Sequence, residues 1–274
     1  MIKQTGIVAV ALLASAFVLA TANATTVLYD NFSTGNLATS SGPGGGFAPG
    51  GGAGNTGASE SGGVAVVGGG SGADENIYSL HSFNPVGTTL TWDVASLPSI
   101  GAAGASIGWA QSGVYTCGGC GPEIYLEARD DFARFAVGDS NGWHEYFNIP
   151  TGSSGTDTDY PGGAVPLTMV LTLTASTWSA DITGPGTDIE QSGSFITGFA
   201  PSDVMADAGG LLSTFGGTRS DCPGCGDVGT FSLAEIQAAP EPASLLLLSL
   251  GFVGTIGASR RHCKSRVRST AVHA

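Results

Sequence analysis

Alternating apolar and polar residues dominate the middle of the chain and predict β-strands. In the segment TTLTWDV, Leu90, Trp92 and Val94 alternate with threonine and aspartate, which is the period of a half-buried strand. The segment PLTMVLTLTASTWSADIT predicts a hairpin of two such strands. The residues expected to face inward are Leu167, Met169, Leu171 and Leu173 on its first strand and Trp178, Ala180 and Ile182 on its second.

Further strands are expected in EIYLEAR, RFAVGD, WHEYFNI, EQSGSFIT and GTFSLAEI. Turns rich in Gly, Pro, Asn and Asp separate them, and no amphipathic helix is expected outside the apolar segments at the two ends of the chain. The glycine-rich stretch 42–72 is interpreted as long loops around a short strand at 64–67, with a disordered linker as the alternative. The pattern predicts an all-β fold, a two-sheet antiparallel β-sandwich.

The N-terminal segment has the three parts of a secretory signal peptide. Lys3 provides the positive start, residues 7–20 form an apolar run, and the chain reaches a small-x-small sequence at Ala24. We therefore expect a signal helix over residues 1–24 and cleavage between Ala24 and Thr25.

The C-terminal segment combines a short motif, an apolar run and a basic tail. Residues 243–258 carry no charge and would span about 24 Å as a helix, which is short for a bilayer core of about 30 Å. The tail 259–274 contains five basic residues and is expected to stay in the cytoplasm. Pro240, Glu241 and Pro242 precede the apolar run, and the prolines hold this tripeptide extended.

The order of motif, apolar helix and basic cluster resembles the PEP-CTERM sorting signal of Gram-negative bacteria. The resemblance implies export by the general secretion machinery and transient residence in the inner membrane. It also implies recognition of Pro240–Glu241–Pro242 by an exosortase and delivery to the outer envelope or the extracellular matrix. The alternative is a permanent C-terminal anchor.

The charge of the exported body excludes a class of partners. The whole chain carries a formal net charge of −13, but residues 25–239 contain only three basic residues, Arg129, Arg134 and Arg219, against 21 acidic ones. This body of about −18 repels phosphate backbones, so we expect no nucleic-acid partner.

A second resemblance concerns the body itself. The first segment VLYDNFS, the central LTLTASTWSADITG and the last GTFSLAEI are similar to concanavalin-A-like jelly rolls. That family pairs its first and last strands in one sheet, which implies a single domain over residues 25–239.

Four cysteines form two CxxC pairs in the segments TCGGCGP and DCPGCGD. They are Cys117, Cys120, Cys222 and Cys225. In an oxidising compartment, two disulfides are the favoured interpretation. A structural zinc site is the alternative, because the second pair resembles rubredoxin and zinc-ribbon knuckles, although about a hundred residues separate the pairs.

Other candidates are weaker. Asp157 and Asp159 could contribute oxygens to calcium, and Trp143 and Tyr146 in NGWHEYFNI could contact a glycan. Glu123 and Glu127 lie on one strand face roughly 13 Å apart, too far for the paired carboxyl groups of a glycosidase, and are expected to be solvated.

The sequence therefore predicts a non-enzymatic exported protein that is structural or adhesive in the exopolysaccharide layer. The alternative is a carbohydrate-binding, lectin-like module, and a glycoside hydrolase is the least favoured interpretation. No cofactor is expected apart from structural zinc or calcium at the residues named above.

Overall fold

A computed structural model describes residues 24–50, 58–68, 74–98, 103–111, 121–139, 142–162, 165–219 and 228–239. Within it, Thr25–Ala238 forms one compact unit. The predicted signal helix, the apolar run 243–258, Pro240–Glu241–Pro242 and all four CxxC cysteines lie outside the described residues. No helix in the described part of the chain is long and apolar enough to cross a membrane.

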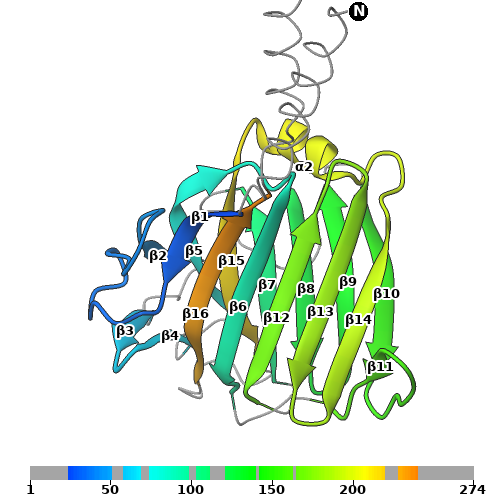
Figure 1. The fold of residues 1–274 in the computed structure, drawn as a ribbon, viewed down its shortest axis with the longest axis horizontal. Helices are drawn as coiled ribbons and strands as arrows, with labels where there is room; N and C mark the ends of the chain where they lie inside the picture. The colour runs from blue at the N-terminus through cyan, green and yellow to red at the C-terminus, as the bar shows by residue number, and fades with distance from the viewer. Residues whose placement is uncertain are drawn as a thin grey trace, which may run out of the picture. The chain divides into compact units, whose positions relative to one another are not determined.

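The unit is a sandwich of two antiparallel sheets that stack face to face (Figure 1). The nine-stranded sheet has the order β11-β14-β13-β12-β6-β16-β4-β3, and β1 also pairs with β16. Its strands are β1 (Thr25–Asp30), β3 (Ser59–Ser61), β4 (Val64–Gly68), β6 (Thr88–Ser96), β11 (Thr158–Asp159), β12 (Leu167–Leu173), β13 (Thr177–Gly184), β14 (Thr187–Ser194) and β16 (Val228–Ala238). The predicted pairing of the first and last strands is confirmed, since β1 pairs with β16 from Thr25↔Ala238 to Asp30↔Ala234.

The seven-stranded sheet has the order β10-β9-β8-β7-β15-β5-β2. Its strands are β2 (Phe47–Gly50), β5 (Asp74–Phe83), β7 (Gly104–Ala110), β8 (Glu123–Arg129), β9 (Phe132–Asp139), β10 (Gly142–Pro150) and β15 (Leu212–Arg219). Several of these strands were not expected from the sequence, among them β5, β7 and β15 in the middle of the sheet.

The strands with alternating apolar and polar residues bury the residues that the sequence predicts to face inward. Along β6, buried and partly exposed residues alternate, and the hairpin β12–β13 buries all seven residues expected to face inward. Aromatic rings from both sheets meet between the layers. Trp92 lies 5.4 Å from Phe47, and Trp178 lies 4.9 Å from Phe135 (ring centroids). Edge-on and tilted contacts of this kind add to the burial of large apolar surfaces.

One helix, α2 (Pro201–Ala208), is present where no helix was expected. Its signals are in the sequence: Pro201 opens the helix, and Asp203 accepts a hydrogen bond from the backbone N–H of Ala200 at 3.0 Å. Gly209 ends the helix in the left-handed conformation, at φ 77°. These are usual positions for proline, aspartate and glycine at helix ends.

Candidate functional site on the seven-stranded sheet

A cluster of charged and aromatic side chains lies on the face of the seven-stranded sheet that is turned away from the core. We call this face the outer face. It carries Glu123, Tyr125, Glu127 and Arg129 of β8, Arg134 of β9, and Trp143 and Glu145 of β10. On β8 the alternate residues Ile124, Leu126 and Ala128 belong to the core. Glu123 and Glu127 therefore share one face of β8, as predicted.

The prediction that the polar face of β8 is solvated is wrong. Glu123 is 2% exposed, Glu127 6% and Arg129 9%. Buried charges of this kind must be compensated by neighbouring groups. Arg134 pairs with Glu127, and Asp131 pairs with Arg129. A strand pattern alone does not show these pairs.

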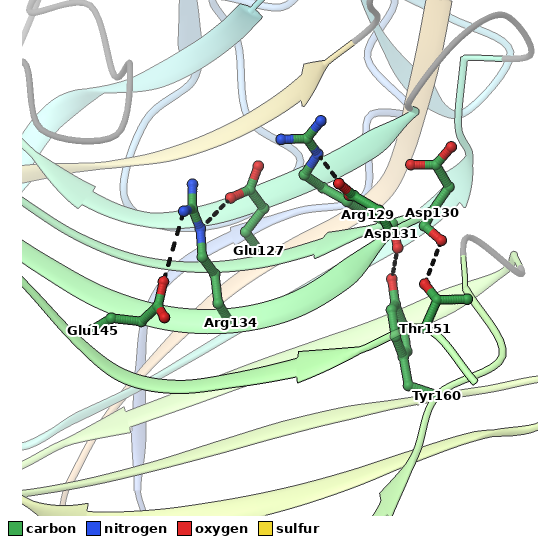
Figure 2. Close-up of polar contacts among 8 residues, drawn as sticks. All are labelled: Glu127, Arg129, Asp130, Asp131, Arg134, Glu145, Thr151 and Tyr160. Carbon is green, nitrogen blue, oxygen red and sulfur yellow. Dashed lines mark hydrogen bonds and ion pairs between the residues drawn. The ribbon is translucent and has the colours of Figure 1, made fainter. Parts of the chain in front are cut away.

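Arg134 is at the centre of the cluster (Figure 2). Its Nε donates to Glu127 Oε2 at 2.7 Å, and its Nη1 lies 3.8 Å from Glu145 Oε2. Strand register explains the first contact, because Glu127 and Arg134 are directly opposite each other on β8 and β9. The guanidinium group also lies over the ring of Trp143, 4.6 Å from its centroid. Arg134 thus joins three strands of the sheet.

Trp143 is the accessible aromatic residue of the cluster. Its residue exposure is 37%, and it lies on β10, the edge strand of the sheet. The ring contacts Tyr125 edge-on at 5.9 Å between centroids. Held between Arg134 and Tyr125, the indole has a defined orientation while part of its surface remains open to solvent.

Tyr125 is buried beneath this exposed residue. It is 4% exposed, and its hydroxyl has no hydrogen-bond partner among the described residues. Burial raises the pKa of Tyr125 well above its ordinary value. The nearby Arg134 lowers this pKa, and Glu127 and Glu123 raise it. The phenol therefore remains protonated under physiological conditions.

The structure separates Trp143 from Tyr146, the other predicted glycan contact. A β-bulge in β10 between Glu145 and Phe147 leaves Tyr146 without a partner on β9. A bulge turns two successive residues toward the same side, so Tyr146 and Phe147 both pack inward against Phe135. The Tyr146 hydroxyl donates to Phe199 O at 3.3 Å and accepts from Ile196 N at 3.2 Å. The Tyr146 hydroxyl thus connects β10 to the segment between β14 and α2, and Tyr146 does not share the outer face with Trp143.

Figure 2 also shows a second group of contacts, which fixes the turn between β8 and β9. Arg129 Nε lies 3.3 Å from Asp131 Oδ1. The Tyr160 hydroxyl donates to the carbonyl of Arg129, and the Thr151 hydroxyl donates to the carbonyl of Asp130. These bonds connect the turn to the segment that follows β10, and they position the end of the outer face.

Of the predicted calcium ligands, Asp157 directly precedes β11 and Asp159 is the last residue of β11, which pairs with β14. Asp159 Oδ1 accepts from Gly155 N at 2.8 Å, and the backbone carbonyl of Asp157 accepts from Gln191 Nε2 at 3.0 Å. In the described part of the chain there is no group of three or more His, Cys, Asp or Glu side chains that could hold a metal ion. At the predicted signal cleavage site, Thr25 is the first residue of β1.

The comparisons with solved structures define the class of fold as a lectin-like, concanavalin-A-like β-sandwich. The Emp47p carbohydrate recognition domain matches with a TM-score of 0.55 at 10% identity, covering 80% of this chain and 98% of that domain. Lectin II from Ulex europaeus matches with a TM-score of 0.50 at 11% identity, covering 78% of this chain and all of the lectin. The CBM2 module of the evolved Dit protein of Lactobacillus casei BL23 phage J-1 matches at 0.52 and 9% identity, covering 79% of this chain and 96% of the module.

The particular feature of this chain is its sorting signal. The family model of the PEP-CTERM protein-sorting motif matches residues 238–261. The chain is therefore an exported protein with an exosortase sorting motif attached to a lectin-like sandwich. No curated protein matches the chain.

Proposed function

We propose that the exported sandwich is an adhesive, non-enzymatic component of the exopolysaccharide layer, and that it binds polysaccharide at the outer face through Trp143. The observation that carries the proposal is the geometry of Trp143, an exposed indole on an edge strand that Arg134 and Tyr125 hold in place. A fixed indole offers a flat apolar surface to the C–H face of a sugar ring. Its neighbours Glu145 and Arg134 offer an acceptor and donors for sugar hydroxyls.

Glu123 and Glu127, the carboxyl pair of β8, do not have the spacing of a catalytic pair. A glycosidase needs two carboxyl groups about 5 Å apart for retention, or up to about 9.5 Å apart for inversion. Glu123 and Glu127 are four residues apart on one strand, with Tyr125 between them, so their backbones are roughly 13 Å apart. Glu127 is also engaged by Arg134 at 2.7 Å, whereas an acid–base carboxyl group must exchange protons with its substrate.

A binding assay on the host's own exopolysaccharide and on a glycan array tests the proposal. We expect Trp143→Ala to weaken binding at least tenfold, because the stacking surface is lost. Leu211→Ala is the matched control: Leu211 is 55% exposed, and we expect its loss to leave binding unchanged. Equal binding by both variants would contradict the site, and an absence of binding by the unmodified protein would leave a purely structural role. If the protein releases reducing ends from the polysaccharide and Glu127→Gln abolishes this release, the proposal that the protein is not an enzyme is contradicted.

We further propose that the chain passes through the inner membrane by way of residues 243–258 and is released to the outer envelope or matrix of a Gram-negative cell. The mass of the unreduced protein from its host tests this processing. A mass beginning at Thr25 and ending near Pro240 is expected. A mass that retains residues 259–274 would show a permanent anchor instead.

A further inference from the structure

The turn that follows β1 contains a fully buried carboxyl group. Asp30, the last residue of β1, is 0% exposed. Its Oδ1 accepts hydrogen bonds from Phe32 N at 2.9 Å and from the hydroxyl and backbone N of Ser41 at 3.3 and 3.4 Å. Its Oδ2 is shielded from solvent and has no hydrogen-bond partner among the described residues. Half of a charged group is therefore left without compensation, which is costly in a protein interior.

The next residue adds a second oxygen of the same kind. Asn31 Oδ1 is also shielded from solvent and has no partner in the described part of the chain. The backbone N of Asn31 donates to Ser41 Oγ at 2.9 Å, and this hydroxyl group also contacts Asp30. Two acceptor oxygens thus lack donors on one turn.

A second carboxylate lies in the same region. Glu60 of β3 is 8% exposed and accepts from Gly35 N at 2.6 Å and from the Thr34 hydroxyl at 3.0 Å. Both donors belong to the connection between β1 and β2. Burial raises the pKa of Asp30, and the charge of Glu60 raises it further. The connection between β1 and β2 thus contacts both carboxyl groups, because Phe32 and Ser41 donate to Asp30 and Thr34 and Gly35 donate to Glu60.

Among the described residues, no ion pair joins a basic side chain to Asp30 or Glu60. Between residues 25 and 239 the basic residues are Arg129, Arg134 and Arg219, on β8, β9 and β15 of the other sheet. The first two contact acidic groups of their own sheet. Buried carboxylates without a basic partner are neutralised by a proton or by a metal ion.

We propose that Asp30, Asn31 and Glu60 form a calcium-binding site. Carboxylate and amide oxygens are hard ligands, and calcium accepts six to eight oxygens in irregular geometry, including backbone carbonyls and water. Magnesium requires near-ideal octahedral geometry, which an irregular turn provides less readily. A bound calcium would attach the connection between β1 and β2 to β3 and thereby join the edges of the two sheets. This site is independent of Trp143 and of the predicted ligands Asp157 and Asp159.

Calcium titration into the chelator-treated protein tests this site, with thermal unfolding and isothermal calorimetry as readouts. We expect one calcium per chain. Extracellular modules bind calcium at about 10⁻⁴ to 10⁻³ M, so a tenfold excess over the dissociation constant raises Tm by about 3 to 6 °C. Magnesium at the same concentration is expected to give a smaller shift.

Two variants and one control locate the ion. Asp30→Asn keeps the shape of the side chain and is expected to abolish the calcium-dependent shift while leaving the calcium-free protein at least as stable. Glu60→Gln is expected to weaken calcium binding at least tenfold. Asp159→Asn, the control, is expected to bind calcium like the unmodified protein. The proposal is overturned if calcium produces no shift, which would mean that a proton neutralises Asp30, or if only Asp159→Asn abolishes the shift.

Discussion

Gly216 of β15 leaves room for the ring of Trp92, a fully buried core residue, and Gly216→Ala should therefore be strongly destabilising. A Cβ atom at Gly216 would lie 2.4 Å from Cζ3 of Trp92 and 2.7 Å from two further ring carbons. Carbon atoms in contact are about 3.5 to 4.0 Å apart, so the ring would have to move by about 1 Å. Phe47 and Phe231 lie 5.4 and 5.0 Å from the Trp92 ring and limit this movement.

We expect Gly216→Ala to lower the free energy of unfolding by about 3 kcal/mol, at the upper end of the usual range for overpacking a core. For a domain of this size, that corresponds to a Tm lower by about 6 to 12 °C. Urea unfolding monitored by tryptophan fluorescence measures the change. Gly138→Ala on β9 is the matched control, because its new Cβ would meet its nearest neighbour at 3.4 Å, an ordinary contact.

A double-mutant cycle tests the mechanism itself. Trp92→Phe reduces the ring at the point of the clash, so the double variant Gly216→Ala/Trp92→Phe should be more stable than the two single losses added together, by at least about 1 kcal/mol. Equal unfolding midpoints for Gly216→Ala and Gly138→Ala would refute the reasoning, and so would strict additivity in the cycle.

Two further predictions concern stability. Tyr146→Phe removes bonds to Phe199 O and Ile196 N and should lower the free energy of unfolding by about 1 to 2 kcal/mol while leaving glycan binding intact; unchanged urea midpoints or lost binding would contradict this. Asp181 lies opposite Glu190 in the β13–β14 pair, and burial, followed by this like charge, raises its pKa. The charged form of Asp181 is therefore disfavoured in the folded state, so Asp181→Asn should stabilise the protein at pH 7 by about 0.5 kcal/mol. This gain should disappear as the pH falls through the raised pKa of Asp181 to below 3.8, and midpoints at pH 7 and pH 3 test it.

Strands with one face in the core could be predicted from the sequence. On β6 and on the hairpin β12–β13, large apolar residues recur at every second position because one face of each strand packs between the sheets. β7 and β15 gave no such signal. Glycine occupies Gly104 and Gly108 on one strand and Gly216 and Gly217 on the other, and a residue without a side chain removes the alternation.

The candidate site could be predicted only in part, because it depends on contacts between strands. The sequence predicted Trp143 as a glycan contact, but it predicted Glu123 and Glu127 to be solvated. It did not predict a role for Arg134, which β-sheet register places opposite Glu127. The one feature of the sequence that pointed to Arg134 was the scarcity of basic residues, because few cations were available to pair with the many carboxylates. The bulge that turns Tyr146 inward is set by pairing with β9 and is invisible in the alternation of β10 alone. The burial of Asp30 likewise depends on how the connection between β1 and β2 packs, which the sequence pattern does not show.

The distribution of charge explains why adhesion would require a specific site. Acidic residues outnumber basic ones by 21 to 3 in the exported body, and all three arginines belong to strands of the seven-stranded sheet. Elsewhere the unbalanced acidic charge disfavours non-specific contact with anionic polymers, over a screening length of about 8 Å at physiological salt. Beside Trp143, Arg134 pairs with Glu127 and lies near Glu145, so its single positive charge offsets part of the acidic charge there. In the proposed function, a polysaccharide would approach this edge of the sheet, where the acidic charge is partly offset and the indole of Trp143 is exposed.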